Sequence, residues 1–276
     1  MAPLSVRAEP GSLHLRVISA VVLAPVALGA VWAGGLWLTL LTAAAAGLMA
    51  AEWTKLCSGG RFGAEGVLLV AAVVLAAAVA GAGYFGPALA VAGAGAAIVL
   101  GICGARGCAA PRLLAFGALY IGVPCVSILW LSADPATGRA VLFWILALVW
   151  ATDIGAYAFG RTIGGPKLAP RVSPKKTWAG LIGGVASAAV AGLATAHVAN
   201  APSAAAVVAV SAGLAVIEQF GDLAESAVKR RFGVKDAGTL IPGHGGMLDR
   251  LDGLLAVAPA VALLSLIGGS SVLIWR

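Results

Sequence analysis

Long, uninterrupted apolar runs constrain this chain more than any other feature of its sequence. A run of about 20 apolar residues can cross the hydrocarbon core of a bilayer as a helix, and such runs recur from Arg16 to the C-terminus. They are continuous rather than alternating in polarity, which predicts helices and not a transmembrane β-barrel. Only 11% of the residues are charged, against about 25% in a soluble domain, so the chain cannot cover a water-facing surface. The predicted spans are residues 17–34, 36–52, 67–85, 87–103, 113–132, 140–160, 178–198, 202–221 and 254–274.

The positions of Lys and Arg predict which side each loop faces. Positive residues accumulate in cytoplasmic loops, and with a cytoplasmic N-terminus every Lys and Arg except Arg139 and Arg276 falls on that side. The chain is therefore predicted to be an all-α integral membrane protein of about nine transmembrane helices, with its C-terminus on the opposite side. The first run, which follows Arg7 and Arg16, is interpreted as a span rather than a secretory signal, because further membrane segments follow it.

Charge divides the chain into two predicted regions. Residues 1–132 form an N-terminal transmembrane region of about five spans, and residues 133–276 form a catalytic transmembrane region with polar loops. Segments 153–178 and 218–252 hold more than half of the basic residues and most of the acids. Positive charge alone would set the topology, so this mixed charge indicates a site. The net charge of +7 is assigned to cytoplasmic loops and an anionic ligand, not to nucleic acid, because no soluble basic domain is present.

The first candidate segment lies at the end of the eighth span. If the helix continues there, Asp222, Glu225, Ser226 and Lys229 fall on one face. Acids at the end of a membrane span usually face a cavity, a partner or a metal. A second interpretation stays open, in which Asp222–Ser226 and Glu225–Lys229 pairs merely neutralise the helix end.

The second segment, residues 235–252, precedes the last span. Its proline and glycines predict an open backbone whose N–H groups can approach an anion. Asp249 and Asp252 are three residues apart at the start of a helix, on one face, and carboxylates so placed suit Mg²⁺. The structural alternative is a polar turn in which the two acids only cap the helix.

The third segment combines Asp153, an acid inside an apolar span, with a loop of Lys, Arg, Ser and Thr. Acids within spans are functional candidates, and the loop has phosphate-binding chemistry. An anchor of the positive-inside kind would explain Lys175 and Lys176 but not Asp153. Together the three segments predict metal-dependent phosphoryl or nucleotidyl transfer at the cytoplasmic face.

These segments resemble the phosphatidate cytidylyltransferases, also called CDP-diacylglycerol synthases, over about residues 150–253. The matching stretches are Asp153-Ile-Gly-Ala-Tyr157, Gly160-Arg161, Ser173-Pro-Lys-Lys-Thr-Trp178, Gly221-Asp-Leu-Ala-Glu225-Ser226, Ser226-Ala-Val-Lys229-Arg230, Lys235-Asp-Ala-Gly238 and Pro242-Gly-His244-Gly-Gly246-Met-Leu-Asp249-Arg-Leu-Asp252. Two positions depart from the family pattern: Gly253 stands where Ser is usual, and Ile154 where Thr is common.

The resemblance implies an enzyme that joins CTP to phosphatidic acid, giving CDP-diacylglycerol and pyrophosphate with one or two Mg²⁺ ions. The catalytic residues it implies are Asp153, Asp222, Lys229, His244, Asp249 and Asp252, with Asp222, Asp249 and Asp252 as metal ligands. The substrate-binding residues it implies are Lys167, Ser173, Lys175, Lys176, Ser226, Arg230, Lys235, Gly245, Gly246 and Arg250.

The expected setting is the cytoplasmic membrane, with the active site facing the cytoplasm, where CTP is available. The expected partners are the two substrates and membrane lipids, and a homodimer is allowed. Two alternatives stay open: transfer to another lipid phosphate, and an ion-coupled transporter. The transporter is disfavoured because the acids cluster at one membrane face, whereas transporter sites tend to lie near the midplane.

Overall fold

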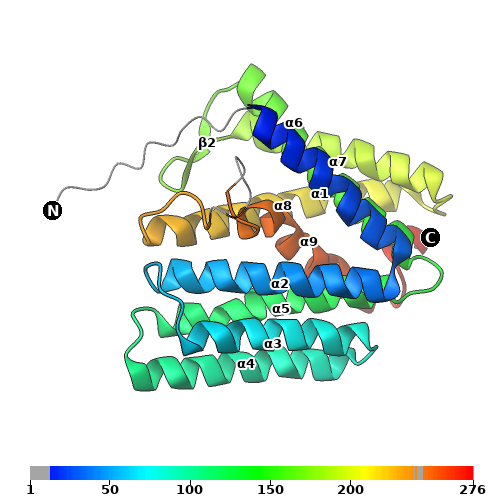
Figure 1. The fold of residues 1–276 in the computed structure, drawn as a ribbon. Coiled ribbons are helices and arrows are strands. Elements are labelled where there is room, and N and C mark those ends of the chain that lie inside the picture. The colour runs from blue at the N-terminus through cyan, green and yellow to red at the C-terminus, as the bar shows by residue number, and fades with distance from the viewer. Residues whose placement is uncertain (1–12, 239, 241–244, 276) are drawn as a thin grey trace.

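The computed structural model describes residues 13–238, 240 and 245–275 of the chain. Within those residues the fold consists of nine α-helices, one two-stranded hairpin and a short 3-10 turn (Figure 1). The elements are α1 (Leu13–Ala33), α2 (Gly35–Cys57), α3 (Ala64–Gly81), α4 (Phe85–Arg106), α5 (Pro111–Ser132), α6 (Gly138–Thr162), β1 (Lys167–Ala169), β2 (Ser173–Thr177), α7 (Trp178–Val198), α8 (Ala204–Arg231), α9 (Leu248–Ile267) and η1 (Val272–Ile274).

The predicted helical membrane protein is confirmed. Eight helices, α2 to α9, are long and apolar enough to cross a membrane, while the described apolar stretch of α1, Val21–Ala33, is shorter than a span. Each predicted span corresponds to one helix, with its ends displaced. The largest shift is in α8, which continues to Arg231 although the predicted span stops at residue 221. The predicted span stops where charges accumulate, from Asp222 onward, whereas a helix continues as long as its backbone is hydrogen-bonded.

The helices form a bundle whose loops separate into two ends (Figure 1). Helices α2, α4, α6 and α8 all finish at one end, on the left of the view, and α9 begins there; we call this the charged end. The turns α1–α2, α3–α4, α5–α6 and α7–α8 lie at the other end. The loops that the charge count assigns to one side therefore do lie together. That this side is cytoplasmic stays a prediction.

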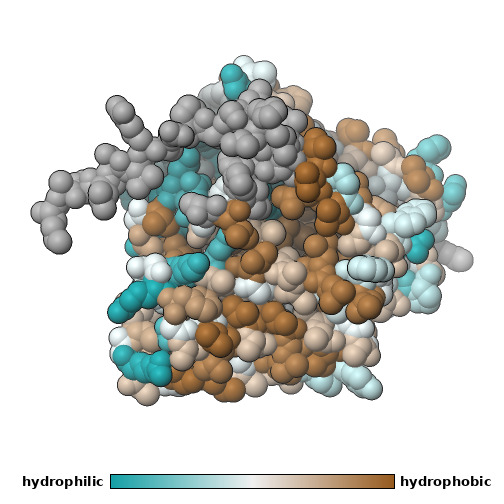
Figure 2. Space-filling view, viewed as in Figure 1, coloured by the Kyte–Doolittle hydropathy of each residue, from teal (hydrophilic) through white to brown (hydrophobic). Residues whose placement is uncertain are grey.

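Apolar side chains cover much of the outer surface between the two ends. Figure 2 shows hydrophobic colour across the middle of the visible face and hydrophilic colour toward its left and right edges. Val67, Leu75 and Ile98 are more than half exposed on this protein. A soluble protein rarely leaves large contiguous apolar patches open to water, so this surface fits the interior of a bilayer.

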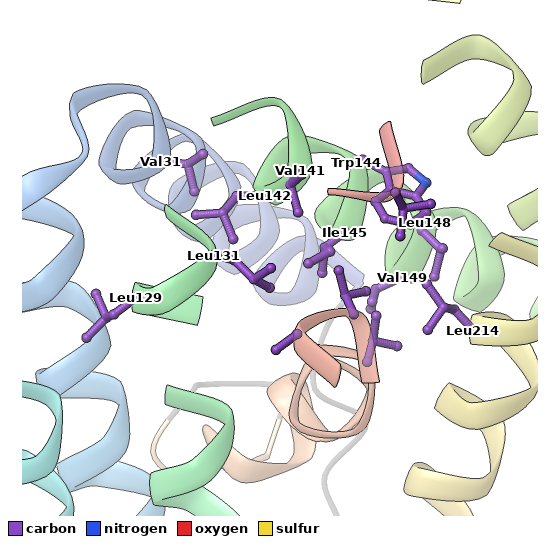
Figure 3. Packing of buried hydrophobic residues seen from close by; sticks show 14 of the residues in the cluster. Val31, Leu129, Leu131, Val141, Leu142, Trp144, Ile145, Leu148, Val149 and Leu214 are labelled. Atoms are coloured by element: carbon purple, nitrogen blue, oxygen red, sulfur yellow. The ribbon is translucent and has the colours of Figure 1, made fainter. Parts of the chain in front are cut away.

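A buried cluster fixes α6 against its neighbours. Figure 3 shows Ile145 and Leu148 of α6 lying between Leu131 of α5 and Leu214 of α8, all of them in one hydrophobic core. Trp144 packs in the same core, and its indole N–H donates to Oγ of Ser211 in α8 at 2.9 Å. Since a buried indole N–H needs an acceptor, this bond sets α6 relative to α8. These two helices carry acids of the candidate site.

The hairpin is a feature that the sequence analysis did not predict. Strands β1 and β2 pair antiparallel, with Lys167 opposite Thr177 and Ala169 opposite Ser173. Such short strands, one of them containing Pro174, show no alternation of apolar and polar residues from which pairing could be inferred. Thr177 ends the hairpin and caps α7, because its Oγ1 accepts the N–H of Gly180 at 3.0 Å.

Candidate active site

The polar face predicted for the end of α8 is present. Ser226 donates its hydroxyl to Oδ1 of Asp222 at 3.2 Å, and Lys229 Nζ lies 3.1 Å from Oε1 of Glu225. These are the two pairs that the structural interpretation of the segment predicted. Asp222 and Lys229, however, also contact charged groups from other elements, so neutralisation of the helix end does not account for them fully.

The hairpin contributes a lysine to this face. Nζ of Lys176 in β2 lies 2.6 Å from Oδ2 of Asp222 and donates to Oε1 of Gln219 at 3.0 Å. The side chains of Lys176 and Asp222 are only 17% and 28% exposed, so the pair is partly shielded from solvent. The polar segments around 153–178 and 218–252, far apart in sequence, therefore meet in one site.

A second lysine–carboxylate pair joins α8 to α9. Nζ of Lys229 lies 2.7 Å from Oδ1 of Asp249, and the two side chains are only 9% and 5% exposed. Oδ2 of Asp249 also accepts the N–H of Ala237 at 2.9 Å and that of Gly246 at 2.8 Å. Both oxygens of Asp249 thus already accept hydrogen bonds. A metal ion bound by Asp249 would have to displace one of these donors.

Acids from three helices converge beside these pairs. Asp252 lies one turn along α9 and interacts electrostatically with Asp222 of α8 and Asp153 of α6. Helices α8 and α9 approach closely here, because a Cβ built on Gly221 would lie 2.5 Å from Cβ of Ala256. The predicted acids of α6, α8 and α9 therefore belong to one region.

The donor set fits a metal that binds together with a phosphate ligand. In the part of the chain that the structure describes, no group of three or more His, Cys, Asp or Glu side chains is placed to hold an ion. Mg²⁺ commonly takes one or two carboxylates and completes its shell with water and substrate phosphates. Asp222 and Asp252 match that habit in number and chemistry, but both oxygens of Asp222 also contact donors, on Ser226 and Lys176, so a metal there, as at Asp249, would have to displace one of them.

Two of the predicted basic residues also have structural contacts. Arg230 links the hairpin to the turn after α8, since its Nε donates to the carbonyl of Val172 at 3.2 Å and its Nη1 to that of Val234 at 2.8 Å. Arg250 is exposed on α9 and interacts electrostatically with Asp153.

The other predicted residues differ in how far the described contacts explain them. Gly246 gives its N–H to Asp249, so that group is not available for the phosphate contact predicted for it. Gly245 has a φ of 89°, a backbone conformation that favours glycine. Ser173 is half-buried at the start of β2, and Lys167, Lys175 and Lys235 are exposed. His244 lies outside the described residues.

The sequence analysis missed two site residues in the N-terminal region. Glu52 of α2 is 6% exposed, and its carboxylate accepts the N–H groups of Met247 and Leu248 at 3.0 and 2.8 Å. The hydroxyl of Tyr120 in α5 lies 3.4 Å from Oε2 of Glu225. The rule that singled out Asp153, an acid within a span, applies equally to Glu52.

Comparison with known proteins covers almost the whole chain. Residues 14–267 match the profile of the cytidylyltransferase family. The chain belongs to this family. A protein of Brucella suis biovar 1 named phosphatidate cytidylyltransferase is 41% identical over 93% of both chains. One of the same name from Pseudomonas aeruginosa is 38% identical over 91% of this chain and 96% of its own. The matched region includes α2, and therefore Glu52.

The departure at position 253 has a packing explanation within this member of the cytidylyltransferase family. A Cβ built on Gly253 would lie 2.8 Å from Cγ of Glu218 and 3.3 Å from Cγ1 of Val149. Glu218 is buried on α8, so its side chain fills the space that a larger residue at 253 would need. Glycine at this position and Glu218 opposite it are sterically matched.

Proposed function

We propose that this chain transfers the cytidylyl group of CTP to phosphatidic acid, giving CDP-diacylglycerol and pyrophosphate. The names of relatives that match over nearly their full length support this reaction. The structural observation that carries the proposal is the meeting of Lys176, from the hairpin, with Asp222 on α8. It brings a cation and a carboxylate together at the charged end of a membrane protein, where a nucleotide and a lipid phosphate can both arrive.

The chemistry is a displacement at phosphorus. An oxygen of the phosphatidate phosphate forms a bond to the α-phosphorus of CTP, and the bond from that phosphorus to the α,β-bridging oxygen breaks, which releases pyrophosphate. Phosphoryl-type transfers need positioning and charge neutralisation more than covalent help from the protein. Lys176 and Lys229 supply positive charge from partly shielded positions, where electrostatic interactions are stronger than in water.

Mg²⁺ is part of the proposal. Asp222 and Asp252 would hold the ion together with the phosphates of the nucleotide, and a bound ion would supply positive charge to the phosphate oxygens. Asp249 anchors Lys229 and the backbone before α9. A metal role for Asp249, and a second ion, stay predictions.

The proposed location is the cytoplasmic membrane with the charged end in the cytoplasm. The excess of Lys and Arg in the loops of that end supports this orientation. CTP would then reach the site from the aqueous phase, and phosphatidic acid from the bilayer. A homodimer stays a prediction.

The test is an assay of the purified protein with CTP, Mg²⁺ and phosphatidic acid. We expect pyrophosphate and a CDP-lipid in equal amounts. Lys176→Ala should lower turnover at least tenfold, because it removes a partly shielded positive charge from the site. Arg171→Ala, an exposed change beside β2, should leave turnover unchanged. No product from phosphatidic acid, with product from another lipid phosphate, would overturn the substrate assignment.

A further inference from the structure

A carboxylate from α2 caps the start of α9. Oε1 of Glu52 accepts the N–H of Met247 at 3.0 Å, and Oε2 accepts that of Leu248 at 2.8 Å. The first N–H groups of a helix have no partner within the helix, and that end of the helix is partially positive. Glu52, which is buried, therefore supplies from another helix the acceptors and the negative charge that α9 needs.

Two glycines allow the backbone to approach this carboxylate. A Cβ built on Gly238 would lie 2.5 Å from Oε1 of Glu52, and one built on Gly246 would lie 2.6 Å from Oε2. Neither glycine has a positive φ. A side chain at either position would therefore have to displace the Glu52 carboxylate from its hydrogen bonds.

The same backbone segments also contact Asp249. Gly246 and Ala237, the neighbour of Gly238, both donate their N–H groups to Oδ2 of Asp249. Asp249 in turn pairs with Lys229 at 2.7 Å. Glu52 and Asp249 thus hold the same two pieces of backbone, and a displacement at Glu52 would be passed to Lys229 through hydrogen bonds and steric contact.

We propose that Glu52 is a positioning residue for the active site. It fixes the backbone around Gly238 and Gly246 and thereby the orientation of Asp249 and Lys229, without touching the substrate itself. The activity measurements that test this inference rest on the proposed function, whereas the structural measurement, hydrogen exchange, does not.

A double-mutant cycle on turnover tests the steric part of the inference. Gly238→Ala should lower kcat/KM by about tenfold to a hundredfold, since small misplacements of catalytic groups can cost that much. In a Glu52→Ala background, the added methyl group has room, so the same change should cost little more. Equal losses from Gly238→Ala in both backgrounds would overturn the proposal.

Glu52→Gln separates positioning from simple folding stability. It keeps the size of the side chain and one acceptor oxygen, but presents an NH₂ group to the other N–H donor. We expect it to fold, to lower kcat with a smaller change in KM for CTP, and to be more active than Glu52→Ala. A Glu52→Gln protein with unaltered kcat would contradict the inference.

Hydrogen exchange provides a measurement that needs no substrate. In Glu52→Ala and Glu52→Gln, the amides of Met247 and Leu248 should exchange faster, while those in the middle of α9 should keep their protection. Glu65→Gln is the matched control, because Glu65 is also a glutamate of the N-terminal region, in the first turn of α3, but it pairs with Arg106 and not with the start of α9. Unchanged exchange at 247 and 248 would reject the positioning role. Faster exchange there in the two variants, together with a wild-type protein that is inactive on phosphatidic acid, would instead reject only the proposed function.

Discussion

Lys229 stands between two carboxylates, at 3.1 Å from Glu225 and 2.7 Å from Asp249. Its side chain and both acids are almost fully buried. Removal of one member of a buried ionic group is strongly destabilising, because the remaining charges lose their compensation. Lys229 is therefore a structural link between α8 and α9, in addition to the role in charge neutralisation that we propose for it.

Lys229→Met should for this reason lower the free energy of unfolding by about 3–5 kcal/mol and abolish turnover. Unfolding in mixed micelles, followed by circular dichroism, measures the first effect, and pyrophosphate release measures the second. Lys229→Met in an Asp249→Asn background should be less destabilising than the sum of the two single changes. If the two losses of unfolding free energy simply add, the contact between Lys229 and Asp249 contributes no interaction energy, which would contradict this account.

At the scale of elements, the turn between α5 and α6 is organised by one carboxylate. Oδ1 of Asp134 accepts the N–H groups of Ala136 and Thr137 at 2.8 and 2.9 Å. These bonds, mainly that from Thr137, hold the pKa of Asp134 below its ordinary value. A carboxyl group whose pKa is lower in the folded than in the unfolded protein stabilises the fold at any pH above its unfolded-state pKa. This stabilisation is lost as the pH falls through the pKa of the folded state.

Asp134→Ala should accordingly lower the free energy of unfolding at pH 7 by about 0.5–1.5 kcal/mol, the net contribution of a typical hydrogen bond. The difference from wild type should shrink as the pH falls below the ordinary pKa of an aspartate. Turnover should be unaffected, since Asp134 belongs to the α5–α6 turn, which lies at the opposite end of the bundle from the charged end (Figure 1). A stability difference that does not change with pH would contradict this account of Asp134.

The sequence predicted the helices far better than the contacts between them. Apolar runs locate spans because a bilayer requires them, and the spacing from Asp222 to Lys229 placed those side chains on one face. The pairing of Lys176 with Asp222 depends on how the hairpin folds onto α8, and Glu52 reaches α9 across the bundle. Local patterns carry no information on such long-range contacts, which only tertiary packing determines.

At the scale of the whole molecule, the two predicted regions share one interior. Leu248 and Leu255 of α9 lie in the same buried cluster as Trp53 of α2 and Leu114 of α5. Packing therefore extends across the predicted boundary at residue 132, and the N-terminal helices support the candidate site directly. The division into 1–132 and 133–276 stays a prediction about function rather than folding.

The central claim, cytidylyl transfer at the charged end, is tested most directly by following the two ends of the triphosphate. The purified protein is incubated with Mg²⁺, phosphatidic acid and CTP labelled at either the α- or the γ-phosphorus. The account predicts that the α-label enters the lipid product and the γ-label leaves as pyrophosphate, and that Asp222→Asn abolishes both. Appearance of the γ-label in the lipid, or no labelled lipid from either nucleotide, would contradict it.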